Sequence, residues 1–174
     1  SACLVGSEMC IRDRSVNKDA RTITVTDNGI GMDKEDLENN LGVIASSGSY
    51  KFKQEVGDDT KDTDVIGQFG VGFYSAFMVC DQVTVRTRKF GSDTAYQWQS
   101  SGADGYTVTE CDKSDAGTEV IMHLKDDTED EHYSEFLEEW KLRELIKKYS
   151  DYIRFPIRME VSKTLSLIHI SEPT

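Results

Sequence analysis

The feature that most constrains the fold is the alternation of apolar and polar residues between Gln82 and Leu124. Successive side chains of a β-strand point to opposite faces, so a period of two predicts strands that bury one face. Glycines interrupt the alternation and mark the expected turns, at positions 91, 102, 105 and 117. The spacing therefore predicts an antiparallel meander.

Helical patterns surround these strands. Helices are expected at 33–44, 71–79 and 133–152, and a further half-buried strand at 22–26. In the first helix Asp33 can cap the amino end, and Leu37, Leu41 and Ile44 fall at helical spacing. The 71–79 segment is apolar nearly all round, which predicts a buried helix. Helices interleaved with a mostly antiparallel sheet define a two-layer α/β sandwich.

Two glycine-rich turns point to a ligand. The first, Asp27-Asn-Gly-Ile-Gly-Met32, follows the 22–26 strand, and the second, Gly67-Gln-Phe-Gly-Val-Gly-Phe-Tyr74, opens into the 71–79 segment. Glycine lets the backbone approach a ligand closely, and free backbone N–H groups at the start of a helix hold phosphates. An acidic turn paired with an amide-rich turn therefore predicts a nucleotide site.

Asp27 is the residue expected to read the base. An ionised carboxylate only accepts hydrogen bonds, so it can bind the exocyclic amine of adenine and refuse the carbonyl that guanine has there. The alternative is that Asp27 only opens a turn, as many Asp-Gly pairs do. The full Asp-x-Gly-x-Gly-Met pattern after a strand favours the ligand.

Together the two turns resemble the ATP-binding domain of the heat-shock protein 90 chaperone family, over about Val16 to Lys163. The resemblance implies the ATPase fold of gyrase, heat-shock chaperones and histidine kinases, incomplete here at the N-terminus, with ATP or ADP as ligand. Thr118 would support the adenine and its bound water. The implied ATP-binding residues are Asp27, Gly31, Met32, Asn40, Leu41, Ser46, Ser47, Gly48, Gly70, Val71, Gly72, Phe73 and Thr118.

One position departs from the family pattern. Many relatives carry lysine where this chain has Ser46, so a cation that could pair with phosphate is replaced by a hydroxyl. Weaker phosphate binding is expected unless Lys51 or Lys53 supplies the charge.

The resemblance also implies what this chain lacks. In the family a general-base glutamate and a magnesium-binding asparagine lie on a helix upstream of the strand that ends at Asp27. We therefore expect no catalytic residue and no metal ligand within residues 1–174, with Mg²⁺ held only by the full-length parent. The chain itself should show no ATP turnover and at best weak nucleotide binding, because a base must lie within about 3 Å of the attacking water.

Both ends of the chain look foreign to the pattern between them. Residues 1–14 and 165–174 resemble peptides translated from sequencing-adapter DNA, although they could also be ordinary termini. The expected organisation is a truncated ATP-binding domain over 15–156, followed at 157–164 by the start of a linker to a middle domain.

Composition and charge limit the classes of partner and the compartment that suit this chain. A net charge of −12 argues against a nucleic-acid partner, which would need a basic surface. The four cysteines have no metal-ligand spacing and suit a reducing, cytoplasmic compartment. No apolar run is long enough for a membrane span. For the full-length parent the resemblance implies client proteins, co-chaperones and a homodimer.

Two alternative functions stay open at this point. One is another ATPase of the same superfamily, of the gyrase, mismatch-repair or histidine-kinase type, although its second glycine turn should differ. The other is a module that senses a nucleotide or binds a protein without catalysis.

The segment from Ser46 to Gly67 is polar, contains several glycines and has few apolar anchors, so we expect it to act as a lid over the nucleotide. An ordinary surface loop is the alternative. Hydrogen exchange without nucleotide should be fast there and slow in the flanking helices. Amides that exchange as slowly as those of 71–79 would make the segment a fixed structural element.

Overall fold

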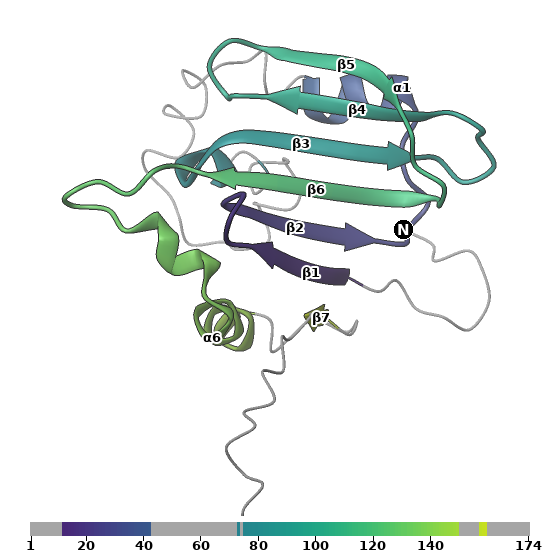
Figure 1. The fold of residues 1–174 in the computed structure, drawn as a ribbon. Coiled ribbons are helices and arrows are strands. Elements are labelled where there is room, and N and C mark those ends of the chain that lie inside the picture. The colour runs from purple at the N-terminus through teal and green to yellow at the C-terminus, as the bar shows by residue number, and fades with distance from the viewer. Residues whose placement is uncertain (1–11, 43–72, 74, 150–156, 160–174) are drawn as a thin grey trace, which may run out of the picture.

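The computed structural model describes residues 12–42, 73, 75–149 and 157–159, and their main feature is a seven-stranded sheet (Figure 1). The strand order across the sheet is β5-β4-β3-β6-β2-β1-β7. Neighbouring strands are antiparallel except β1 and β7, which are parallel. The strands are β1 (Arg12–Asn17), β2 (Thr22–Asp27), β3 (Cys80–Arg88), β4 (Ala95–Ser100), β5 (Tyr106–Cys111), β6 (Gly117–Leu124) and β7 (Ile157–Met159).

The expected meander is correct for β3, β4 and β5, which pair in sequence order. It is wrong for β6, which crosses back and inserts between β3 and β2 instead of pairing with β5. In that central position both edges of β6 are hydrogen-bonded, as an interior strand requires. The crossing brings Thr118 of β6 directly beside Asp27 of β2.

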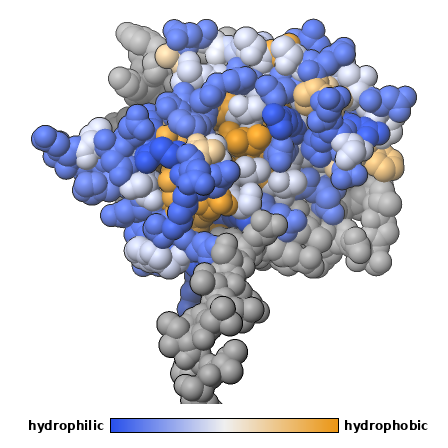
Figure 2. Space-filling view, viewed as in Figure 1, coloured by the Kyte–Doolittle hydropathy of each residue, from blue (hydrophilic) through white to orange (hydrophobic). Residues whose placement is uncertain are grey.

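One face of the sheet carries the core. Val83, Val85 and Trp98 point to it and are at most 1% exposed. Figure 1 shows α1 lying behind the sheet, so the core face is turned away from the viewer. The opposite face is mainly hydrophilic in Figure 2, and there Arg86 Nε donates to Oε1 of its cross-strand partner Gln97 at 2.9 Å. This division is the expected two-layer α/β arrangement.

The first helix begins where the sequence predicts. Asp33 caps α1 (Lys34–Leu37), and its side chain and that of Asp36 bond each other's backbone N–H in a capping box. The helix continues as a π-helical turn, η1 (Glu38–Gly42). Leu37 and Leu41 are both buried, as their spacing predicts, whereas Ile44 lies outside the described residues.

The prediction of a buried helix over 71–79 is only partly correct in its described part. Phe73 is helical, but residues 75–78 form a 3₁₀ turn, η2 (Ser75–Met78), and Met78 is 65% exposed. The Val79 N–H bonds the carbonyl of Ala76 at 3.1 Å, which tightens the chain just before it enters β3. A helix with apolar side chains on all of its faces cannot bury all of them against a single face of a sheet.

The single helix expected over 133–152 is divided in two. A 3₁₀ helix, η3 (Tyr133–Leu137), precedes α6 (Glu139–Tyr149), and Glu138 between them is extended. The break allows Leu137 and Leu142 both to reach the core. Lys18 of the β1–β2 turn contacts the break, since its Nζ lies 3.0 and 2.9 Å from the two carboxylate oxygens of Glu138.

Both boundary segments contribute to the sheet. Arg12 to Arg14, within the segment expected to be non-native, pair with β2 from Val25 to Asp27. Ile157–Met159, expected to open a linker, forms β7 beside β1. The non-native origin of 1–14 stays a prediction, but residues 12–14 belong to the fold. None of the helices in the described part of the chain is long and apolar enough to cross a membrane.

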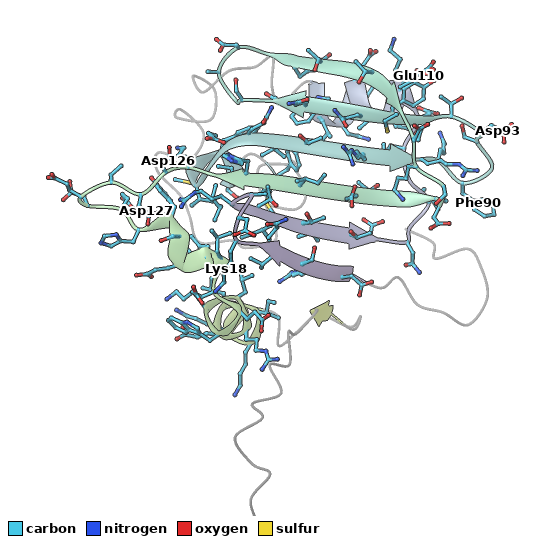
Figure 3. All side chains as sticks on the ribbon, in the orientation of Figure 1. Lys18, Phe90, Asp93, Glu110, Asp126 and Asp127 are labelled. Carbon is cyan, nitrogen blue, oxygen red and sulfur yellow. The ribbon has the colours of Figure 1, made fainter. Side chains whose placement is uncertain are left out.

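Asp127 connects the β1–β2 turn to η3, at the end of the sheet opposite Asp27 (Figure 3). Its carboxylate accepts bonds from the hydroxyl and the backbone N–H of Ser134 and from Nη2 of Arg21 at 3.1 Å. These donors, the Ser134 hydroxyl foremost, lower the pKa of Asp127 to about 2. The charged form is thus favoured by folding.

Asp127 should therefore contribute to the acid sensitivity of the fold. The stabilisation is complete above the unfolded-state pKa of about 3.9 and is lost as the pH falls through about 2. In urea titrations, Asp127→Asn should make the free energy of unfolding fall less steeply between pH 4 and pH 2. Asp126→Asn makes the same charge change one residue away, and an equal effect of the two substitutions would contradict this role.

Candidate nucleotide-binding site

The core face changes from apolar to polar at one end of the sheet. Residues paired across β2, β6 and β3 form rungs, and the first two rungs are Ile23–Met122–Val83 and Val25–Val120–Val85. The last rung is Asp27–Thr118–Thr87, which we call the polar rung. Directly paired residues point to the same face, so these three side chains are neighbours at the carboxyl end of β2 and β3.

The carboxylate of Asp27 is half-buried and held in place by its own turn. Its Oδ1 accepts a hydrogen bond from the Gly29 N–H at 2.9 Å. Within the described part of the chain, Oδ2 accepts no hydrogen bond. One oxygen therefore orients the group, and the other can accept a bond from a ligand.

Two glycines, Gly31 in the turn and Gly117 at the start of β6, allow close approaches between backbones. Gly31 has a positive φ of 68°, and a Cβ there would lie 1.9 Å from the carbonyl oxygen of Arg88. Gly117, at φ 122°, would place a Cβ 2.3 Å from the carbonyl oxygen of Asp27. No other residue type fits either position, because the obstacle is backbone in both cases. The turn is thereby pressed against the ends of β3 and β6.

Thr87 is a site residue that the sequence analysis missed. It is fully buried, at 0% exposure, and its Oγ1 accepts a bond from the Met32 N–H at 2.9 Å. The same oxygen lies 3.0 Å from Oγ1 of Thr118 and 3.2 Å from the carbonyl oxygen of Gly117. The signal was present in the sequence, since Thr87 continues the buried alternation of Val83 and Val85 with a hydroxyl.

Further contacts fix the far side of the turn. The Phe90 N–H donates to the carbonyl of Ile30 at 2.6 Å, and Figure 3 places Phe90 at the same end of the sheet. Lys89 Nζ lies 2.6 Å from Oδ2 of Asp33 and 2.8 Å from Oδ2 of Asp36. The ammonium group of Lys89 and the Asp36 N–H lower the pKa of Asp33, and the two carboxylates raise the pKa of Lys89.

The remaining predicted residues lie beside the turn, in or against the core, or outside the described part of the chain. Asn40 is exposed, with Nδ2 4.0 Å from Sδ of Met32, so it borders the turn. Leu41 is 8% exposed and belongs to the core. Phe73 packs edge-to-face on Trp98, with ring centroids 5.7 Å apart. Ser46, Ser47, Gly48, Gly70, Val71 and Gly72, together with the proposed lid, lie outside the described residues.

The polar rung can read hydrogen-bond donors on a planar ligand. Asp27 offers a charged acceptor, and Thr118 a hydroxyl, at the end of an otherwise apolar face. The described residues do not suit a metal ion, because they contain no group of three His, Cys, Asp or Glu that could hold one. The two acceptors of the polar rung, Asp27 and Thr118, suit a ligand that donates hydrogen bonds.

Comparison with known families identifies the class. Residues 11–127 match the model of the histidine kinase-, DNA gyrase B- and HSP90-like ATPases, which covers more than half of the chain. The chain belongs to this ATPase family. The nucleotide site predicted from the two glycine turns is in keeping with that membership.

Individual relatives narrow the class to the heat-shock protein 90 branch. The Chaperone protein HtpG of Clostridium perfringens is 58% identical over 149 residues, which cover 85% of this chain. Those of Clostridium acetobutylicum and Bacillus velezensis are 57% and 58% identical over 150 and 147 residues, or 86% and 84% of the chain. The chain spans about a quarter of these relatives, 24%, 24% and 23% of their lengths. The resemblance to the heat-shock protein 90 ATP-binding domain is thus confirmed.

The close approach at Gly31 can be tested against a matched glycine. Gly91 also has a positive φ, of 79°, but nothing lies within 4 Å of an added Cβ. Gly91→Ala should lower the free energy of unfolding by about 1 kcal/mol, the cost of the backbone conformation alone. Gly31→Ala adds a backbone clash and should cost about 3 kcal/mol. Equal losses in urea denaturation would show that the turn is not pressed against β3.

Proposed function

We propose that this chain supplies the ATP-binding region of an ATP-dependent molecular chaperone. The observation that carries the proposal is the polar rung: a carboxylate and a hydroxyl at the end of an apolar sheet face, beside a glycine turn fixed in position. An apolar floor suits the flat face of a purine, and the polar end suits its edge.

Asp27 selects adenine in this proposal. The Gly29 N–H occupies Oδ1, so Oδ2 is the oxygen that accepts from the exocyclic amine. Guanine places a carbonyl at that position, and two acceptors facing each other in a partly buried site are unfavourable. Gly31 and Met32 would border the adenine, with the Met32 N–H already bonded to Thr87. The phosphates would extend toward Asn40 and the second glycine turn.

A chaperone is favoured over a gyrase or histidine-kinase type of ATPase. The support is the 58% identity to Chaperone protein HtpG together with the net charge of −12, which does not suit a DNA-binding enzyme. ATP hydrolysis, a homodimeric assembly, and the binding of client proteins and co-chaperones belong to the proposal for the whole protein. A cytoplasmic location is also part of it, in keeping with the free thiols of Cys80 and Cys111.

Mg²⁺ enters the proposal only as the ion that accompanies the phosphates of ATP. The carboxylates of Asp33 and Asp36, at the start of α1, are paired with Lys89 and support the turn instead. We assign no step of the reaction to a metal ligand among the described residues.

Removal of the Asp27 charge is the direct test. Asp27→Asn replaces the acceptor by an amide and should weaken ADP binding at least about 10-fold in calorimetry, because charged hydrogen bonds in buried sites are strong. The matched control is Asp93→Asn, which removes the same charge from the exposed β3–β4 turn. ADP affinity that is unchanged in Asp27→Asn, or reduced equally in both variants, would refute the assignment.

A further inference from the structure

We propose that Thr87 is a positioning residue that sets base selectivity, by making the Thr118 hydroxyl an acceptor toward the ligand. The inference rests on the proposed function of the polar rung. Thr87 is fully buried behind Thr118, so it acts through its neighbour. Its contacts favour one of the two possible placements of the hydroxyl protons.

The proton placement follows from counting donors and acceptors. A threonine hydroxyl has one proton to donate and two lone pairs that accept. Around Thr87 Oγ1, the Met32 N–H can only donate and the Gly117 carbonyl can only accept. If Thr87 donates to Gly117, then Thr118 donates to Thr87, and all three contacts of Thr87 are satisfied hydrogen bonds.

The reverse placement is poorer. If Thr87 donates to Thr118, the 3.2 Å contact between Thr87 Oγ1 and the Gly117 carbonyl is no longer a hydrogen bond. The proton of Thr118 must then find another acceptor. Buried hydroxyls adopt the arrangement with more partners, because an unmade bond costs free energy. The first placement therefore holds, and it leaves both lone pairs of Thr118 Oγ1 available.

The consequence is a rung that presents acceptors only. Asp27 Oδ2 and Thr118 Oγ1 both accept, which suits the two N–H groups of an exocyclic amine or a water bound to it. A base with a carbonyl at that position needs a donor from Thr118. To provide it, Thr118 must release Thr87 and the bond from Thr87 to Gly117 must break. Thr87 thus makes carbonyl bases bind less well.

The test compares ADP with inosine diphosphate, which carries a carbonyl in place of the amine. Both are measured by competition against a fluorescent ADP analogue. Thr87→Val keeps the shape and removes the hydroxyl, so Thr118 is free to donate. The preference for ADP over inosine diphosphate should fall about 5-fold, the effect of one buried hydrogen bond. Thr87→Ser, which keeps the hydroxyl, should retain the preference of the unmutated chain.

A purely structural role of Thr87 predicts a different result. Loss of the partner of the Met32 N–H would loosen the turn and weaken both nucleotides by the same factor. If the ratio of the ADP affinity to the inosine diphosphate affinity is the same in Thr87→Val as in the unmutated chain, the inference is overturned. The same holds if neither the unmutated chain nor Thr87→Val shows detectable binding of inosine diphosphate. When Thr118 is already replaced in Thr118→Val, adding Thr87→Val should no longer change the ratio of the two affinities. If Thr87→Val lowers the ratio there as much as it does in the unmutated chain, the inference is also overturned.

Two further outcomes are kept separate. If Thr87→Val does not fold, Thr87→Cys replaces it, because its thiol keeps a buried acceptor for the Met32 N–H but donates only weakly. Thr87→Cys should lower the preference for ADP over inosine diphosphate, and an unchanged preference overturns the inference. If ADP affinity is unchanged in Asp27→Asn, the proposed function is overturned, and the inference falls with it. Normal ADP binding with an unchanged ratio in Thr87→Val overturns the inference alone.

Discussion

The rest of the structure depends on the pairing of β6 with β2 on one edge and β3 on the other. This register places Asp27, Thr118 and Thr87 side by side, although 91 residues separate the first from the second. A shift of one residue would turn Thr118 to the opposite face and leave Asp27 without a polar neighbour. The close approaches of Gly117 to Asp27 and of Gly31 to Arg88 prevent that shift, because both are limited by backbone.

The polar rung also shows how the fold keeps a polar site at the end of its core. A fully buried hydroxyl is unfavourable unless it is hydrogen-bonded, and Thr87 has three partners within 3.2 Å. The same bonds hold the turn, since one partner is the Met32 N–H. Lys89 adds a second restraint from the outside by bridging Asp33 and Asp36 at the start of α1. The hydrogen bonds of Thr87 and the ion pairs of Lys89 therefore stabilise the fold and position the site at the same time.

The sequence predicted the features that depend on neighbouring residues, namely strand positions, the start of a helix and some of the core residues. Alternation located the strands, Asp33 marked the start of α1, and Leu37 and Leu41 reached the core as their spacing implied. It did not predict the return of β6 to the middle of the sheet, since alternation carries no information on strand order. Alternation placed Thr87 on the buried face, but its role in the site comes from contacts with Met32 and Thr118, 55 and 31 residues away. The break at Glu138 is accompanied by a contact with Lys18, which is 120 residues away in sequence.

The central claim is that the end of the sheet carrying the polar rung binds the base of the nucleotide. The most direct measurement is a titration of the isotopically labelled chain with ADP, followed by amide chemical shifts in two-dimensional NMR. The account predicts the largest changes, among the described residues, at 27–33, 87–90 and 117–118, with little change in β5 and α6. Changes concentrated on α6 or on the hydrophilic face of the sheet, with those three segments unaffected, would contradict it.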